Sequence, residues 1–146
     1  MTQNVLTIKK RKCKKDDYAF VYRLMKTTLF PLIEKYQPVD KKKFDEKFYK
    51  DYGKMVILLR GTRRIGLYEV NEQKRNLYVS RIFLTPFYQG KGVGSQIMKS
   101  FETLGYRKIT LEVWENNPAV SFYKKLGYVI TKKQNHKYFL EKKLTK

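Results

Sequence analysis

The sequence predicts an α/β domain with a mixed sheet, formed by about seven strands and about four helices. Two observations favour this class. The spacing of apolar residues changes along the chain between the helical repeat of 3.6 and the strand repeat of two, so helices and strands interleave. The 146 residues, 42% of them apolar, suffice for one buried core, and no repeat, linker or low-complexity segment divides them. We therefore expect residues 1–146 to form a single domain.

The first third of the chain predicts one strand and two helices. Residues 4–12 predict the strand. Asp16 or Asp17 can cap the first helix, which carries apolar residues at helical spacing, namely Phe20, Val21, Leu24 and Met25. Pro31 lacks a backbone N–H, so a break or kink is expected near it. Asp40 can cap a second short helix with two phenylalanines one turn apart.

Three strands are predicted next. The apolar runs at residues 55–60 and 64–70 are separated by the turn residues Gly61 and Thr62, which is the signature of a hairpin. A polar turn at residues 71–75 opens the third apolar run at residues 76–84. The change of period from 3.6 to two marks this region as sheet.

A helix and a strand follow a glycine-rich segment. The helix is indicated by an apolar stripe that consists of Val93, Ile97, Met98, Phe101 and Leu104. Gly105 lies where a C-terminal glycine cap belongs. Residues 108–113 predict the next strand.

The last helix and two strands complete the prediction. Asn117, which precedes a proline, is typical of a helix N-cap, and the helix is expected to run to Gly127. Residues 128–134 and 137–144 predict two strands joined by a turn at residues 135–136.

The segment RIFLTPFYQGKGVGSQIM, residues 81–98, places three glycines between a predicted strand and a predicted helix. It lacks the kinase and GTPase phosphate loop, G-x-x-x-x-G-K-[ST], and the dinucleotide fingerprint, G-x-G-x-x-G. Its backbone N–H groups would still converge at a helix N-terminus, which attracts anions. Side chains at Gly92 or Gly94 would keep a phosphate at a distance. The segment therefore predicts either a tight turn or an anion site.

Two motifs in this order resemble those of a known superfamily. Residues 89–94, QGKGVG, match the Q/R-x-x-G-x-G/A motif of the GCN5-related N-acetyltransferases (GNAT). Residues 116–128, NNPAVSFYKKLGY, are similar to their second signature, N-x-x-A-x-x-h-Y-x-x-x-G-F/Y, whose fixed positions fall on Asn116, Ala119, Tyr123, Gly127 and Tyr128. The order of predicted elements matches over nearly the whole chain. The resemblance implies the acyl-CoA N-acyltransferase fold, with a mixed and mostly antiparallel sheet.

The resemblance also implies acetyl-CoA as co-substrate and no metal. In this superfamily the glycine loop binds the pyrophosphate of the cofactor through backbone amides. That loop corresponds here to Gln89, Gly90, Lys91, Gly92, Val93 and Gly94, with Ser95 at the helix start. The pantetheine arm would pair with the backbone of Ile82, Phe83 and Leu84, in a splay between the strands at residues 76–84 and 108–113. Asn116 would hydrogen-bond the pantetheine region, and Lys91 is alternatively a surface lysine.

Tyr123 and Glu112 are the candidate catalytic residues. In related enzymes a tyrosine at the position of Tyr123 protonates the departing CoA thiolate, and the alternative is a core tyrosine. A phenol with a pKa of about 10 can do this for a thiolate with a pKa of about 8.5. Glu112 resembles the base proposed in ribosomal-protein N-terminal acetyltransferases, with one residue fewer before the asparagine. Glu69, Glu115 and ordered water are alternative bases, and a structural ion pair is the alternative role of Glu112.

Charge and cysteine content limit partners and compartment. The net charge of +20 suggests acidic partners such as RNA, ribosomes or an anionic cofactor. Lysine outnumbers arginine 25 to 8, however, and arginine suits phosphate recognition better, so a solvated surface is the alternative. No apolar run approaches the ~20 residues of a membrane span, and no signal-peptide core is present. Cys13 is the single cysteine, so a cytoplasmic protein without a membrane partner is expected.

The leading hypothesis is an acetyl-CoA-dependent N-acetyltransferase, in which a primary amine attacks the thioester directly. A protein N-terminus or lysine is favoured, on an acidic or ribosome-associated partner, because polyamines and aminoglycosides share the positive charge of the chain. The alternatives are a catalytically silent RNA- or ribosome-binding module on the same fold, a small-molecule amine acetyltransferase, and transfer of a longer acyl group. His136, expected in an exposed turn, and Cys13 are not expected to act in catalysis. The chain is expected to be a monomer or a homodimer.

Overall fold

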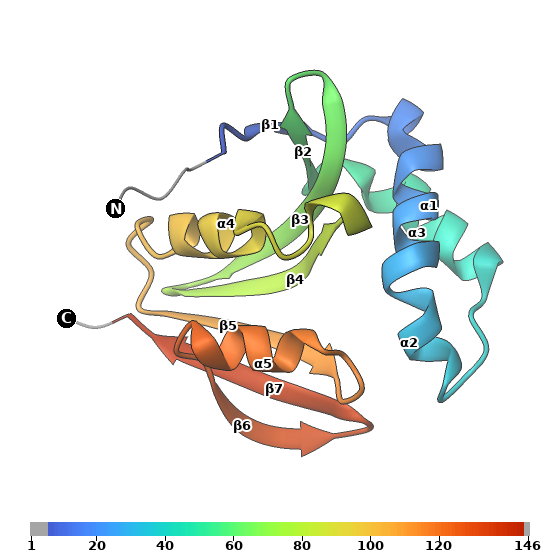
Figure 1. The fold of residues 1–146 in the computed structure, drawn as a ribbon. Helices are drawn as coiled ribbons and strands as arrows, with labels where there is room; N and C mark the ends of the chain where they lie inside the picture. Colours follow the sequence, from blue (N-terminus) through green and yellow to red (C-terminus); the bar gives the residue numbers. More distant parts are fainter. Residues whose placement is uncertain (1–5, 145–146) are drawn as a thin grey trace. The chain divides into compact units, whose positions relative to one another are not determined.

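The computed structural model describes residues 6–144, which form seven strands and five α-helices (Figure 1). The strands are β1 (Lys9–Lys12), β2 (Met55–Arg60), β3 (Arg63–Gln73), β4 (Asn76–Leu84), β5 (Lys108–Trp114), β6 (Val129–Gln134) and β7 (Lys137–Lys143). The α-helices are α1 (Tyr18–Thr28), α2 (Phe30–Glu34), α3 (Lys41–Asp51), α4 (Val93–Phe101) and α5 (Ala119–Lys125). Short 3-10 helices are η1 (Lys15–Asp17), η2 (Tyr52–Lys54) and η3 (Pro86–Tyr88).

Hydrogen bonds join the strands in the order β1-β2-β3-β4-β5-β7-β6. The pairs β1–β2, β2–β3, β5–β7 and β6–β7 are antiparallel, whereas β4 and β5 are parallel. These pairings confirm the predicted α/β class with a mixed, mostly antiparallel sheet. Of the five helices, α2 is the segment that follows the expected break: α1 ends at Thr28, and Pro31 lies in the first turn of α2.

The packing of the backbone groups the described residues into two compact units. Unit 1 consists of residues 6–69 and 81–96, and unit 2 of residues 70–80 and 97–144. Unit 1 contains β1, β2, α1, α2, α3 and the glycine-rich segment, and unit 2 contains β5, α5, β6 and β7. None of the helices within residues 6–144 is both long enough and apolar enough to cross a membrane.

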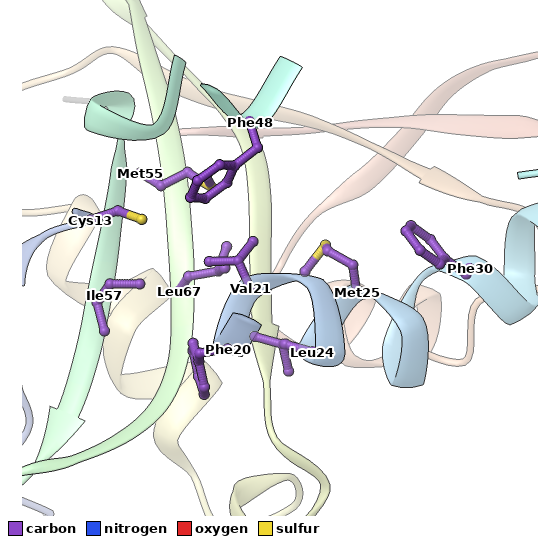
Figure 2. Packing of buried hydrophobic residues seen from close by; sticks show 10 residues of the cluster. All are labelled: Cys13, Phe20, Val21, Leu24, Met25, Phe30, Phe48, Met55, Ile57 and Leu67. Atoms are coloured by element: carbon purple, nitrogen blue, oxygen red, sulfur yellow. The ribbon is translucent and has the colours of Figure 1, made fainter. Parts of the chain in front are cut away.

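The core of unit 1 gathers around α1. The four apolar residues that predicted this helix are all buried, which confirms the helical spacing. Figure 2 shows ten members of the cluster, which come from α1, α2, α3, β2, β3 and the segment before η1. Cys13 is one of them, and burial raises the pKa of its thiol to about 12. A thiol held in its protonated form is a poor nucleophile.

Two predictions for unit 1 need correction. The first strand is shorter than residues 4–12: β1 begins at Lys9, where pairing with Leu59 of β2 begins, and residues 4–5 lie outside the described part. Asp17 occupies the N-cap position of α1, but its side chain does not cap this helix. Its carboxylate instead accepts hydrogen bonds from the backbone N–H of Lys14 and from the guanidinium groups of Arg11 and Arg64.

The other element boundaries follow the sequence more closely. Asp40 caps α3 as predicted, because its Oδ1 accepts the N–H of Lys43 at 3.2 Å. The polar turn before β4 is narrower than expected, since β3 continues to Gln73. The two-residue connection between β2 and β3 is confirmed, and Gly61 has the positive φ of 62° that such a turn requires.

In unit 2 the helix and turn predictions are largely confirmed. Asn117 caps α5, because its Oδ1 accepts the N–H of Ala119 at 2.8 Å. Asn135 and His136 both have positive φ, as the tight turn between β6 and β7 requires. One prediction is wrong: α4 ends at Phe101, so Leu104 lies beyond the helix with 61% of its surface exposed. The buried apolar residues of this unit include Leu77, Val79, Ile109, Leu111, Val113 and Leu140.

Candidate active site

The glycine-rich segment of unit 1 connects η3 to α4. Gly90 and Gly92 have φ values of 73° and 86°, a conformation that L side chains rarely adopt. A Cβ atom at either position would meet no atom within 4 Å, so the space beside this backbone is open. Val93 begins α4, and the N–H of Gln96 makes a helical bond to the carbonyl of Gly92. The first N–H groups of α4 therefore lie at the open end of the helix, where an anion can accept from them.

Side chains of this segment also brace it. The Gln89 amide donates to the carbonyl of Leu84 at 3.0 Å. The Lys91 ammonium lies 4.5 Å from the ring centroid of the exposed Phe87, a cation–π contact. Gln89 thus has a structural contact that the sequence did not reveal, and Lys91 is a surface lysine that remains accessible to a phosphate.

The last part of β4, with Ile82, Phe83 and Leu84, lies against β3 within unit 1. A Cβ atom on Gly66 would be 2.4 Å from the carbonyl oxygen of Phe83, so only glycine fits at this position of β3. The pairing of β4 with β5 extends from Asn76 opposite Lys108 to Val79 opposite Leu111, and both strands continue beyond it. The predicted pantetheine contact lies in this continuation of β4. The sequence prediction missed Gly66, although an isolated glycine in a strand is a signal of close backbone approach.

Tyr123 lies on α5 in unit 2 and is buried. Its ring packs edge-to-face against Phe122 and Tyr128, with centroid distances of 5.1 and 5.7 Å. Burial raises the pKa of Tyr123 above its ordinary value, because a phenolate is poorly solvated there. The phenol is therefore held neutral, which is the form that a proton donor needs. The same side chain is also part of the buried core.

Tyr128 and Asn116 of unit 2 have buried polar atoms. The hydroxyl of Tyr128 has no hydrogen-bond partner within residues 6–144, and only 2% of this residue is exposed. Burial, and then the negative charges of Glu102 and an ionised Tyr123, raise the pKa of Tyr128. The Oδ1 atom of Asn116 is also buried. Sequence reasoning noted Tyr128 only as a motif position and gave no signal of its orphaned hydroxyl.

The candidate bases have distinct surroundings. Glu112 is partly exposed on β5, where its Oε2 accepts from the Tyr78 hydroxyl at 2.8 Å and its Oε1 lies 4.0 Å from the Lys137 ammonium. Glu115 forms an ion pair with Lys133 at 2.7 Å, and its Oε2 lies 2.8 Å from Nδ1 of His136. Glu115 therefore makes closer contacts than Glu112. His136 lies in an exposed turn, as predicted.

Glu69 differs because it is buried, with 8% of its surface exposed, on β3. Its Oε1 lies 3.9 Å from Nε of Arg81 on β4, and both residues belong to unit 1. The structure thus brings Glu69 next to Arg81 of β4, and the glycine-rich segment belongs to the same unit. Glu112, Asn116 and Tyr123 all belong to unit 2. Within residues 6–144 no group of three or more His, Cys, Asp or Glu side chains could hold a metal ion.

Comparison with known families shows to which family the chain belongs. A family model described as an acetyltransferase (GNAT) domain matches residues 32–140, well over half of the chain. The chain belongs to the GNAT acetyltransferase family. The superfamily that the two motifs predicted is thereby confirmed. The comparison with curated proteins finds no significant match.

Solved structures show the same GNAT fold at low sequence identity. The PaiA N-acetyltransferase from Thermoplasma acidophilum, crystallised with coenzyme A, is 18% identical with a TM-score of 0.73, covering 94% of this chain and 99% of that one. An acetyltransferase from Thermus thermophilus is 18% identical with a TM-score of 0.76, covering 95% of this chain and 98% of that one. The ribosomal-protein-S18-alanine N-acetyltransferase from Escherichia coli is 15% identical with a TM-score of 0.69, covering 96% of each chain.

Proposed function

We propose that this GNAT-family protein transfers the acetyl group of acetyl-CoA to a primary amine. The observation that carries the proposal is the glycine-rich segment, with positive φ at Gly90 and Gly92 and open space beside them at the start of α4. A pyrophosphate there would accept from the backbone N–H groups of residues 89–95. The coenzyme A complex of the PaiA enzyme supports the same ligand for this chain.

The reaction needs positioning more than reactive side chains. The amine attacks the thioester carbonyl, its N–C bond forms as the C–S bond breaks, and the thiolate takes up a proton. The backbone of Ile82, Phe83 and Leu84 would hold the pantetheine arm, together with Asn116. Tyr123 would donate the proton, since burial keeps its phenol neutral.

Glu112 is the proposed base. Its carboxylate is oriented by the Tyr78 hydroxyl and remains partly exposed, so an incoming ammonium can reach it. A base matters because a lysine-like ammonium is almost fully protonated at neutral pH, whereas an α-amine with a pKa near 7.7 is partly free.

The acceptor is proposed to be a protein N-terminus or a lysine. The similarity to the ribosomal-protein-S18-alanine N-acetyltransferase supports a protein acceptor, and the net charge of +20 favours an acidic or ribosome-associated partner. Small-molecule amines and a silent RNA-binding module remain alternatives that the same experiment separates. We propose the cytoplasm as the compartment, with which Cys13 as a buried free thiol is compatible.

The test incubates the purified protein with labelled acetyl-CoA and a cytosolic extract, which is then resolved into protein, RNA and small-molecule fractions. We expect label in the protein fraction above the level without enzyme. Tyr123→Phe should reduce that label by about 100-fold, since general acid catalysis contributes about this much, while acetyl-CoA binding persists in calorimetry. Absence of label, together with salt-sensitive RNA binding and no acetyl-CoA binding, would favour the RNA-binding module instead.

A further inference from the structure

One face of the sheet in unit 2 carries the proposed base together with aromatic and lysine side chains. β5, β7 and β6 are neighbouring strands (Figure 1), and their register places Glu112 opposite Phe139 and Phe139 opposite Lys132. Trp114 lies opposite Lys137, two residues further along β5. Residues that are directly opposite one another, or two positions apart on one strand, point to the same side of a sheet. We call the surface formed by these five residues the Glu112 face.

The two lysines of the Glu112 face lie against its aromatic rings. The Lys137 ammonium is 4.8 Å from the ring centroid of Trp114 and 4.0 Å from Oε1 of Glu112. The Lys132 ammonium is 4.6 Å from the ring centroid of Phe139. An aromatic ring attracts an ammonium group but carries no charge that would neutralise it. Both positive charges are therefore held on the same face as the proposed base.

Glu112 does not fully neutralise these two lysines. Its distance of 4.0 Å from Lys137 is longer than the 2.7–2.9 Å of a charge-assisted hydrogen bond. The side chains of Lys137 and Glu112 are 37% and 29% exposed, and Lys132 is exposed as well, so an incoming group can reach all three. The five residues carry two ammonium groups and one carboxylate, and the ammonium of an acceptor would add a third positive charge. A carboxylate on the acceptor would offset this repulsion.

The spacing of the strands indicates where on the acceptor that carboxylate should lie. Lys137 is a diagonal neighbour of Glu112, at about 7–8 Å. Lys132 is two strands away, at about 10 Å. An extended peptide advances about 3.4 Å per residue. An acceptor whose α-amine lies at Glu112 therefore brings the side chain of its second or third residue near both lysines.

We propose that the Glu112 face binds a peptide acceptor through an acidic side chain at its second or third residue, which pairs with Lys137 and Lys132. The α-amine of the same peptide lies at Glu112. This inference rests on the proposed function and narrows its acceptor to a protein N-terminus with an acidic sequence. RNA is another anionic partner that suits lysines beside aromatic rings. The carboxylate of Glu112 on the same face would repel its phosphates, however, and this favours the peptide.

Three matched peptides test the proposal on the unmodified protein. The first carries glutamates at its positions 2 and 3, the second carries glutamines there, and the third carries the two glutamates at positions 7 and 8. We expect kcat/KM of the first peptide to exceed that of the second about fivefold at low salt, since an exposed ion pair contributes up to about this factor. Screening should remove most of this difference at about 0.5 M salt.

The third peptide separates a local contact from attraction by the net charge of the whole chain. It has the same charge as the first peptide, but its glutamates lie too far from the α-amine to reach Lys132 or Lys137. It should therefore react like the second peptide. Equal kcat/KM values for the first and second peptides, or for the first and third, would overturn the proposal.

Variants then assign the preference to the two lysines. Lys137→Gln and Lys132→Gln should each reduce the preference for the first peptide over the second to about twofold, while acetyl-CoA binding stays unchanged. The ratio is the readout because an altered base at Glu112 would slow both peptides alike. Lys99→Gln is the matched control: it removes one charge from an exposed lysine of α4, outside the Glu112 face, and should keep the full preference. An unchanged preference in both Lys137→Gln and Lys132→Gln would overturn the assignment.

The remaining outcomes distinguish this inference from the proposed function. Salt-sensitive binding of an oligouridylate that both lysine variants weaken, without any preference among the peptides, would assign the face to RNA instead. Binding of acetyl-CoA without acetylation of any peptide would overturn the peptide acceptor alone. Absence of acetyl-CoA binding in the unmodified protein would contradict the proposed function itself.

Discussion

The hydroxyl of Tyr78 on β4 donates a hydrogen bond to Oε2 of Glu112 on β5, at 2.8 Å. Burial first, and then the hydrogen bond to Glu112 and its charge, raise the pKa of Tyr78, so the phenol remains a donor throughout the neutral range. Tyr78 lies opposite Thr110 in the parallel pairing, two residues before Glu112. The contact therefore ties the two strands together at the end of their paired stretch and orients the carboxylate of the proposed base.

Replacing Glu112 separates its two roles. Glu112→Gln keeps an oxygen that accepts from Tyr78, so the fold should persist, and kcat should fall about 100-fold if the carboxylate accepts a proton. Tyr78→Phe, which removes the donor but not the carboxylate, should change kcat far less. Steady-state kinetics and thermal melts of both variants check this. If kcat of Glu112→Gln equals that of the unmodified protein, Glu112 is not the base, and its role is the contact with Tyr78 alone.

Gly92 is expected to affect cofactor binding through both its conformation and its missing side chain. In Gly92→Ala the φ of 86° is strained by about 1 kcal/mol, and the new methyl group occupies the open space beside the loop. The Kd for acetyl-CoA should rise about tenfold or more, because a phosphate can no longer approach the N–H groups.

Gly105→Ala is the matched control for that variant. Gly105 has a similar φ of 92°, and a methyl group there would also meet no atom within 4 Å, but this residue lies after α4 in unit 2. The two variants should lose similar stability, whereas calorimetry should show weaker acetyl-CoA binding for Gly92→Ala alone. Equal Kd values would mean that the loop does not bind the cofactor.

Gly66 should be sensitive for a different reason. A methyl group there would lie 2.4 Å from the Phe83 carbonyl oxygen and 2.8 Å from Cδ2 of Leu84, so β4 would have to shift. We expect Gly66→Ala to lower the free energy of unfolding by about 1–3 kcal/mol, as overpacking usually does. Gly53→Ala, where nothing lies within 4 Å and φ is not positive, should stay within about 0.5 kcal/mol. Denaturant unfolding of both variants measures the difference. Equal free energies of unfolding would contradict the close approach of Gly66 to β4.

Local patterns carried the successful predictions. The buried face of α1 follows from the spacing of its own residues, and the cap of α3 from Asp40. Leu104 continues the apolar stripe of α4 in the sequence, yet the helix ends at Phe101. The spacing of apolar residues alone does not show where the helix ends. Helix ends are decided by hydrogen bonds of the last turn rather than by the stripe.

Contacts between residues far apart in the sequence could not be predicted. Arg64 reaches Asp17 across 47 positions, Arg81 lies 12 positions from Glu69, and Phe83 limits Gly66 from the neighbouring strand. In the sequence alone, the charged residues among them look like any other charged residue, and Gly66 looks like any other glycine in a strand. Their pairing depends on strand register, which the hydrophobic pattern restricts only to a choice of face. The contact of Glu69 with Arg81 thus emerges only when β3 and β4 are placed in three dimensions.

Asp17 should make the stability of unit 1 dependent on acid pH. The hydrogen bond from Arg11 lowers the pKa of this buried carboxyl most, opposed by burial and assisted by the Lys14 N–H and by Arg64. A carboxyl with a lowered folded-state pKa stabilises the fold above its unfolded value of about 3.9, and this stability is lost as the pH falls below it.

The corresponding variant is Asp17→Asn. Removing the charge leaves Arg11 and Arg64 without their anion and should cost roughly 2 to 3 kcal/mol at neutral pH, below the figure for fully buried pairs because both arginines are partly exposed. The difference from the unmodified protein should shrink below about pH 4. Asp16→Asn, at an exposed position, should change little, and denaturant unfolding at several pH values measures all three proteins. A constant difference across that range would exclude Asp17 as the titrating group.

Tyr128 should make the stability of the fold fall at alkaline pH, whereas Asp17 makes it fall at acid pH. Its hydroxyl has no partner within residues 6–144, so Tyr128→Phe removes a buried unsatisfied group and should raise stability by about 1 kcal/mol. Burial raises the folded-state pKa of Tyr128 above the unfolded value of about 10, so the stability that this group contributes is complete below that pH and is lost above it.

The phenylalanine variant should therefore lose less stability than the unmodified protein between about pH 9 and about pH 11, since it has no phenol at this position to ionise on unfolding. Thermal melts over that range measure both effects. Tyr49→Phe, which changes an exposed ring on α3, is the control and should follow the unmodified protein. A lower Tm in Tyr128→Phe at neutral pH would contradict this account and show that the hydroxyl has a hydrogen-bond partner in solution, such as a buried water.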